Sequence, residues 1–182
     1  MVVALALLGC DDPAASGAGG INSTTFLAFD LAAAWTWRDD GDTGLVLDDE
    51  TLLHGRMDAD GRVEVRRGAR YALGSVAGLF TWKLDTEDIV LAAWQWGDEG
   101  SDTPTVLAVG GSEDGQVASN GEGACTPQRY ESLPTSYGEF PDVLACVCVN
   151  TAAPDGTYWF AENFGLVKTD TSPFDLDLVA PW

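Results

Sequence analysis

Positive charge and histidine are scarce in this chain. It has 9 Lys and Arg residues against 29 Asp and Glu residues, which gives a formal net charge of −20 at pH 7. Such a surface repels nucleic acid and anionic headgroups, so we expect no nucleic acid partner. His54 is the only histidine, and a C-x-C spacing does not suit zinc, so we expect no zinc site and no cofactor.

Helical patterns and long apolar runs are also missing. No window beyond the first ten residues keeps a helical period for three turns, and no later apolar run approaches the roughly 20 residues that span a bilayer. The sequence contains neither a phosphate loop nor a dinucleotide fingerprint. The stretch 74–78, GSVAG, does not match G-x-S-x-G, because its first glycine is adjacent to the serine. These absences favour a protein that acts by binding or by structure.

Short strands and tight turns make up most of the chain. Hydrophobic residues account for 46% of it, and apolar and polar residues alternate over 62–66 and 80–84. Turn pairs that are typical of type I′ hairpins recur between these runs, namely Asp-Gly at 40–41, 60–61, 114–115 and 155–156, and Asn-Gly at 120–121. We therefore predict one all-β domain over residues 24–182, an antiparallel meander in the form of a curved sheet, a half-barrel or a sandwich.

The first ten residues, MVVALALLGC, form an uncharged apolar segment that ends in Leu7-Leu8-Gly9-Cys10. Residues 11–23 are rich in Gly, Ala and Ser, which is typical of a flexible tether. This arrangement resembles the signal and lipobox of bacterial lipoproteins. The resemblance implies that residues 1–9 are the remnant of a cleaved signal peptide, and that Cys10 carries a diacylglycerol and an N-acyl chain such as palmitate.

The same resemblance predicts where the protein lies. Residues 10–23 would tether the domain to the periplasmic or outer surface of a bacterial membrane, so that the lipid anchor is its membrane contact. No Lys or Arg precedes Cys10, although export signals normally begin with positive charge, and we therefore expect the true start to lie upstream.

Three further cysteines are candidates for a disulfide: Cys125, Cys146 and Cys148. Cys146 and Cys148 are two residues apart in a strand-like run, so their side chains point the same way and cannot easily bridge each other. A bond from Cys125 to either of them is reasonable if the segment between is a hairpin. It would stabilise the domain by roughly 3 kcal/mol in the chain-entropy model, and the third cysteine would be left as a thiol.

The C-terminal half contains two further patterns, YGEFPDVL at 137–144 and TYWFAENFGLVK at 157–168. They resemble the closing hairpins of a diffuse group of uncharacterised secreted all-β bacterial proteins, and Trp35-x-Trp37 resembles the opening strand of that group. Such proteins are similar to the half-barrels of periplasmic lipoprotein carriers. The group has no agreed active-site residues to transfer, and this chain shows no long helix to fill a concavity.

Tryptophans form the strongest chemical pattern. In Trp35-Thr36-Trp37 and Trp94-Gln95-Trp96 one polar residue separates two indoles, so both rings of each pair share one face of a strand. Together with Trp82 and Trp159, the rings either pack in a core or line a groove for a sugar or an acyl chain. The candidates for ligand binding are Trp35, Trp37, Trp94, Trp96 and Trp159.

Carboxylates provide two weaker sets of candidates. Acid-rich turns suit weak calcium binding, but each D-x-D run stops after two acids, so turn formation is the simpler explanation; these residues are Asp40, Asp42, Asp58 and Asp60. A pair of carboxylates for hydrolysis could come from Asp85, Glu87, Asp88 and Glu162. We expect His54 to be a half-buried structural residue.

These patterns predict a lipid-anchored protein of the cell envelope with a non-catalytic binding or structural role, in which the sheet contacts an envelope protein. The first alternative is a carrier that holds an acyl chain or another apolar ligand in an aromatic-lined concavity. The second alternative is a hydrolase that uses carboxylates. Tightly packed rings favour the first function, whereas rings that face an open cavity favour the carrier.

Overall fold

The structure is a computed structural model that describes residues 21, 26–27, 34–39, 52–68, 75–172 and 174–181. Over these residues the backbone forms thirteen strands, which are all antiparallel to their neighbours. The strands are β1 (Ala34–Asp39), β2 (Leu52–Met57), β3 (Arg62–Arg67), β4 (Val76–Trp82), β5 (Ile89–Trp96), β6 (Glu99–Ser101), β7 (Thr105–Ala108), β8 (Ala118–Asn120), β9 (Gly123–Pro134), β10 (Glu139–Val149), β11 (Gly156–Ala161), β12 (Gly165–Thr171) and β13 (Leu176–Pro181).

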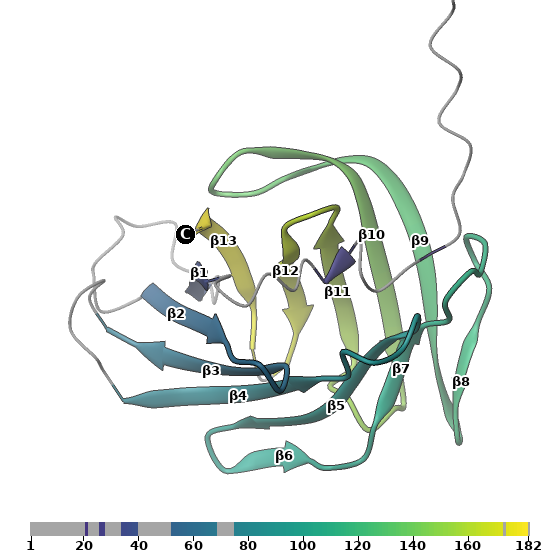
Figure 1. Ribbon diagram of the computed structural model, residues 1–182, viewed down its shortest axis with the longest axis horizontal. Coiled ribbons are helices and arrows are strands. Elements are labelled where there is room, and N and C mark those ends of the chain that lie inside the picture. The colour runs from purple at the N-terminus through teal and green to yellow at the C-terminus, as the bar shows by residue number, and fades with distance from the viewer. Residues whose placement is uncertain are drawn as a thin grey trace, which may run out of the picture.

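The strands belong to one meandering sheet that curls into a half-barrel (Figure 1). Its order is β6-β5-β4-β3-β2-β1-β13-β12-β11-β10-β9-β8, and β7 pairs with the first part of β5. Pairing between β1 and β13 joins the two halves of the chain. The predicted all-β meander is confirmed. Of the three predicted shapes the half-barrel is observed, because a sandwich would need two separate sheets.

Alternation along each strand sends one row of side chains into the concave interior. In β3, Val63 and Val65 are buried, whereas Arg62 is exposed and Glu64 is half-buried. Because side chains point to opposite faces with a period of two, the two valines share the inner face. Rows from both halves of the sheet meet there and form one continuous core, whose largest buried members include Trp37, Leu53, Met57, Phe80, Leu144, Tyr158, Phe160 and Phe174.

Residues near the N-terminus take part in this core. Ile21, Phe26 and Leu27 are buried, and the backbone of Ile21 exchanges two hydrogen bonds with residues 111–112, Gly111 N donating over 2.7 Å and Ser112 O accepting over 3.3 Å. The guanidinium of Arg129 lies 5.4 Å from the centre of the Phe26 ring. Ile21 falls inside the predicted tether of residues 10–23, so packing begins earlier than the predicted boundary at residue 24.

The turns differ from the predicted type I′. Gly61, Gly115 and Gly121 have φ values of 77°, 78° and 67°, but the residue before each of them keeps a negative φ, whereas type I′ needs two positive values. Between β2 and β3, Gly61 N donates to Asp58 O, which is the pattern of a type I turn followed by a left-handed glycine. The prediction of type I′ turns is therefore wrong at these pairs, because the glycine alone takes the left-handed conformation.

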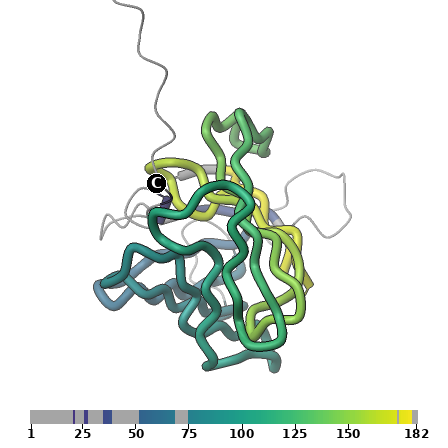
Figure 2. Tube along the Cα trace, turned by 90° about the vertical axis from the view of Figure 1, so that its right-hand side faces the viewer, coloured from purple at the N-terminus to yellow at the C-terminus, as the bar shows by residue number. Residues whose placement is uncertain are grey.

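The two longest strands, β9 and β10, form an arm whose tip arches toward β13 (Figure 1) and stands out at the top of Figure 2. At this tip the backbone N–H and the hydroxyl of Ser136 donate to the Asp177 carboxylate, and Tyr137 N donates to Leu178 O over 2.8 Å. Asp177 is only 4% exposed, and Arg38 donates to it over 3.3 Å. A paired buried charge therefore holds the arm to the sheet.

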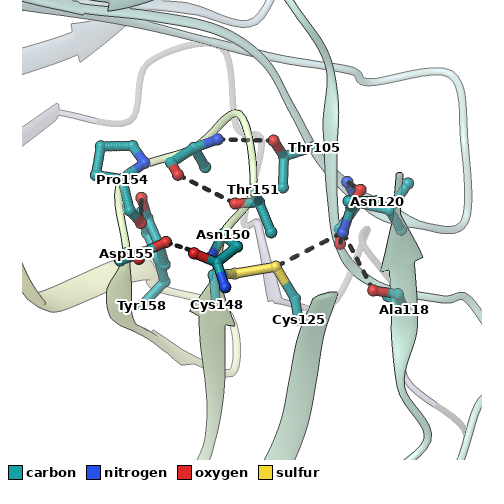
Figure 3. Close-up of a disulfide and its surroundings, with 12 residues drawn as sticks. Thr105, Ala118, Asn120, Cys125, Cys148, Asn150, Thr151, Pro154, Asp155 and Tyr158 are labelled. Carbon is teal, nitrogen blue, oxygen red and sulfur yellow. Dashed lines mark hydrogen bonds between the residues drawn. A yellow bond between two sulfur atoms is a disulfide. The ribbon is translucent and has the colours of Figure 1, made fainter. Parts of the chain in front are cut away.

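A disulfide between Cys125 and Cys148 joins the other end of β9 to β10 (Figure 3). Cys146 is buried and not bonded. The prediction left the partner of Cys125 open, and the structure pairs it with Cys148, which lies directly opposite in the register. The two residues are 23 apart in sequence, so the cross-link contributes about 3 kcal/mol in the chain-entropy model.

Next to the disulfide, a side chain links the two ends of the curled sheet. Asn120, the last residue of β8, lies beside the disulfide and donates to Ala118 O (Figure 3). Its side chain also accepts from Val106 N over 2.7 Å and donates to Val106 O over 2.9 Å. This amide therefore replaces one rung of a β-ladder between β8 and β7. The turn after β10 strengthens the junction, because Ala153 N donates to the buried hydroxyl of Thr105 over 2.9 Å.

Replacing Asn120 with alanine should lower the free energy of unfolding by about 1–3 kcal/mol, because the partly buried N–H and C=O of Val106 both lose their partner. Denaturant unfolding followed by far-ultraviolet circular dichroism measures the change. Ser119→Ala on the exposed side of the same strand is the matched control and should leave stability within about 0.5 kcal/mol. An equal loss in both variants would contradict the bridging role of Asn120.

Cys146 should resist thiol reagents in the folded protein. Burial raises the pKa of its thiol well above the ordinary value, and only the thiolate reacts. In a Cys10→Ser variant, Ellman's reagent at pH 8 should detect almost no thiol until guanidinium unfolds the chain, and then one thiol per chain. Full labelling of the native protein at the rate of a free thiol would show that Cys146 is accessible.

Candidate functional site

The first tryptophan pair lies in the interior. The rings of Trp35 and Trp37 stack with centroids 5.7 Å apart and planes 17° apart, which confirms that the pair shares one face. Their indole N–H groups donate to the carbonyls of Phe164 over 2.8 Å and Leu166 over 3.3 Å. Each ring is thereby held on its apolar surface by packing and at its polar atom by the backbone of β12 and the turn before it.

The second pair surrounds Phe174. Trp94 and Trp96 lie 6.2 and 5.3 Å from the centre of the Phe174 ring, and Trp94 donates to Ala152 O over 2.8 Å. Phe80 and Tyr158 also contact Phe174, at 4.9 and 6.4 Å. Four of the five candidate tryptophans are thus packed among other aromatic rings of the core.

The packed rings leave little free volume. A cavity of about 20 Å³ lies between Leu27, Trp35, Trp37, Met57, Val63, Phe80, Trp82 and Leu166. A single water molecule needs about 10–15 Å³ by the same measure. Among the described residues, this aromatic-lined space therefore holds a water-sized molecule and is too small for an acyl chain.

The described carboxylate candidates serve turns and loops. Asp58 accepts hydrogen bonds from the backbone N–H groups of Asp60 and Arg62, over 2.9 and 3.0 Å, which fits the turn interpretation of its D-x-D run. In the described part of the chain, no three His, Cys, Asp or Glu side chains cluster in a way that could hold a metal ion. Asp40 and Asp42 lie outside the described residues.

The hydrolase candidates are distributed over the sheet. His54 on β2 is half-buried, with Nδ1 3.0 Å from Thr36 Oγ1 and Nε2 2.9 Å from Gly68 O. Asp88 precedes β5 and accepts from Gly110 N over 2.7 Å, and β3 and β4 separate β5 from β2. The remaining candidates, Asp85, Glu87 and Glu162, are exposed. These hydrogen bonds give His54 and Asp88 structural roles.

Trp159 differs from the other candidates because it points outward. In β11 the inner positions belong to Tyr158 and Phe160, which are buried, and Trp159 between them is half-buried on the opposite face. Its ring lies 5.2 Å from that of Tyr130 on β9. Since β10 separates these strands, their backbones are about 9.5 Å apart and the two rings must lean toward each other over β10.

The residues of β10 beneath these rings are small. Val143 pairs with Tyr130, and Ala145 pairs with Trp159; both are fully buried although they lie on the outer face. The rings therefore act as a local cover. Tyr130 itself stays 41% exposed, and its hydroxyl donates to Gln128 over 3.1 Å.

The outer face of β9, β10 and β11 carries no charge from the disulfide end of β9 and β10 as far as Tyr130 and its partner Val143; farther toward the arm tip, the same alternation places Glu139 on this face. We call the outer-face patch ten residues of this uncharged stretch, each of which alternation and register place on the outer face: Ala124, Thr126, Gln128, Tyr130, Val143, Ala145, Val147, Val149, Thr157 and Trp159. The corresponding face of β2 and β3 is charged, with Arg56 opposite Glu64 and Arg66 opposite His54. An uncharged face of this size is unexpected in a chain with 38 charged residues, which is the sum of 9 basic and 29 acidic ones.

A shallow hollow of about 670 Å³ opens on this patch. Its lining combines five patch residues with the turns at one end of the strands: Ser119, Gly121, Glu122, Gly123, Ala124, Thr126, Gln128, Val147, Val149 and Asn150. The volume is within the range of about 300–1,000 Å³ that is typical of ligand sites. The sequence patterns indicated Trp159 as a candidate but did not indicate the other residues of the outer-face patch. Except for Tyr130, those residues are neither titratable nor aromatic.

Comparisons with known proteins find no matching family, no matching curated protein and no matching solved structure. Among the described residues, no helix is both long and apolar enough to cross a membrane. Cys10 and the segment that resembles a lipobox lie outside the described residues.

Gly55 should not tolerate a side chain, because it makes room for the indole of Trp37. An added Cβ would lie 2.8 Å from Cη2 of Trp37 and closer still to Cζ3. Gly55→Ala should therefore cost about 1–3 kcal/mol of stability through overpacking. The shorter ring of Trp37→Phe should relieve the clash, so the double variant should lose clearly less than the sum of the two single losses. Additive losses in denaturant unfolding would argue against this contact.

Proposed function

We propose that this protein is a lipid-anchored component of a bacterial cell envelope with a non-catalytic role, and that it binds its partner through the outer-face patch. The observation that carries the proposal is the contrast between the two faces of the sheet. The concave interior is filled by its own aromatic rings, whereas the outer-face patch on β9–β11 has no charged residue and borders a hollow. A ligand-sized recess on the outside, and packed rings inside, favour binding at the surface.

The carrier alternative is less favoured. An acyl chain needs a continuous apolar channel, and the cavity between the interior rings has the volume of about one water molecule. The lipobox resemblance at Cys10 supports the envelope location and the tethered mode of attachment, because two or more acyl chains hold a protein firmly at a membrane.

The wild-type chain should partition into membranes and Cys10→Ser should not. Both are to be expressed in a bacterial host from the longest upstream start, and the membrane fraction and the intact mass are measured. We expect the wild type to carry the added mass of the acyl chains on Cys10, and the variant to be recovered in the soluble fraction.

Cys146→Ser is the matched control, because it replaces a buried cysteine of the folded domain and should leave the lipid mass unchanged. An unmodified Cys10 in the wild type, with the chain in the soluble fraction, would overturn the anchored location.

A further inference from the structure

We propose that the outer-face patch is a binding site for a neutral polysaccharide chain, which names the class of partner for the proposed binding function and rests on it. The class of ligand is inferred from the chemical groups that line the hollow. Its lining offers hydroxyl and amide groups on Ser119, Thr126, Gln128 and Asn150, next to the apolar surfaces of Val147 and Val149. A sugar ring has the same combination, with hydroxyl groups at its edge and C–H groups on its faces.

Aromatic rings complete the site. Tyr130 lies on β9 and is 41% exposed, and the Trp159 ring lies 5.2 Å from it. The C–H face of a sugar packs well on such rings, which present a flat apolar surface. Both rings lie at the Gln128 side of the hollow, so a chain lying along the patch would contact the rings with one unit and the hollow with the next.

Charge argues against other occupants. Glu122 is the one charged residue among those described that line the hollow, so a polyanion would find no cation there and an acid instead. A basic peptide would find a single acid and would be attracted more strongly by the acidic surface elsewhere on a chain of net charge −20. A neutral ligand rich in hydroxyl groups therefore suits the lining of the hollow.

The concave form of the surface favours a chain ligand over a second copy of this protein. Two flat sheet faces pack about 10 Å apart through interdigitating side chains, whereas the hollow would leave a void of about 670 Å³ on each copy. A ligand that fills the hollow must be narrow enough to enter it. The volume fits a short stretch of oligosaccharide, and the open shape allows the chain to continue beyond it.

Isothermal titration calorimetry on the Cys10→Ser protein tests the proposal with three neutral probes: cellohexaose, maltohexaose and hexa-N-acetylchitohexaose. A hexagalacturonate probe of the same length adds negative charge. We expect at least one neutral hexasaccharide to bind and hexagalacturonate not to bind, because its carboxylates would face Glu122 and the acidic surface.

Two matched pairs of variants locate the site. Gln128→Glu and Gln95→Glu each add one negative charge to an exposed glutamine, in the patch and on β5 respectively. Tyr130→Ala and Tyr137→Ala each remove an exposed tyrosine ring, from the patch and from the arm tip. The patch variants should weaken binding by about tenfold or more, and the other two should leave it unchanged. Thermal unfolding of all four verifies that the fold is retained.

Three results would overturn the inference. They are no binding of any neutral probe at millimolar concentration, binding that the patch variants leave unchanged, and a dimer in light scattering that Tyr130→Ala dissociates, which would assign the patch to a second copy. The anchored location is tested separately by the lipid mass on Cys10. Lipidated protein without saccharide binding contradicts only this inference, and unlipidated protein that binds saccharide contradicts only the location.

Discussion

The ring of Phe174 holds the two halves of the half-barrel together. It contacts Phe80, Trp94 and Trp96 from the N-terminal strands and Tyr158 from the C-terminal ones. A single curled sheet has no second layer to cover its concave face, so it must bury that face against itself. Large rings suit this task, because each reaches far enough from its strand to meet rings from the opposite side. Hydroxyl groups of Thr169 and Thr171 fix the Phe174 carbonyl and thereby aim its ring inward.

The same constraint determines what remains available outside. The described residues fill the interior with their own side chains, which leaves the convex face and the edges as the surfaces open to a larger ligand. Asn120, the disulfide and the Asp177 contact hold the free ends of the sheet in place. Asn120 joins β8 to β7, the disulfide joins one end of β9 to β10, and Asp177 on β13 holds the arm tip at their other end. The two longest strands of the outer-face patch are therefore linked at both ends. The patch is therefore displayed on a rigid support.

The sequence predicted those features that depend on alternation alone. The alternation over 62–66 predicted that Val63 and Val65 point inward. The spacing of Trp35 and Trp37 predicted that their indoles share one face of a strand. The sequence did not predict β9, because Pro127 and two charged residues, Arg129 and Glu131, interrupt the expected pattern. The structure accounts for this strand: Pro127 lies near the edge of the sheet, where a missing N–H costs little. Because β9 was not predicted, the outer-face patch was missed in part: its first four residues, Ala124, Thr126, Gln128 and Tyr130, are alternate positions of β9.

Exposed apolar groups on the patch contribute nothing to the core. Val143 and Ala145 are already covered by the rings of Tyr130 and Trp159, whereas Val149 remains 51% exposed in the folded protein. A charged residue at position 149 or 126 would leave the core intact and would suit the acidic character of the chain. The uncharged composition is thus not required by the fold. The proposed contact with a second molecule would give a physical reason, because covering these strands would desolvate any charge beneath the partner at a cost in free energy.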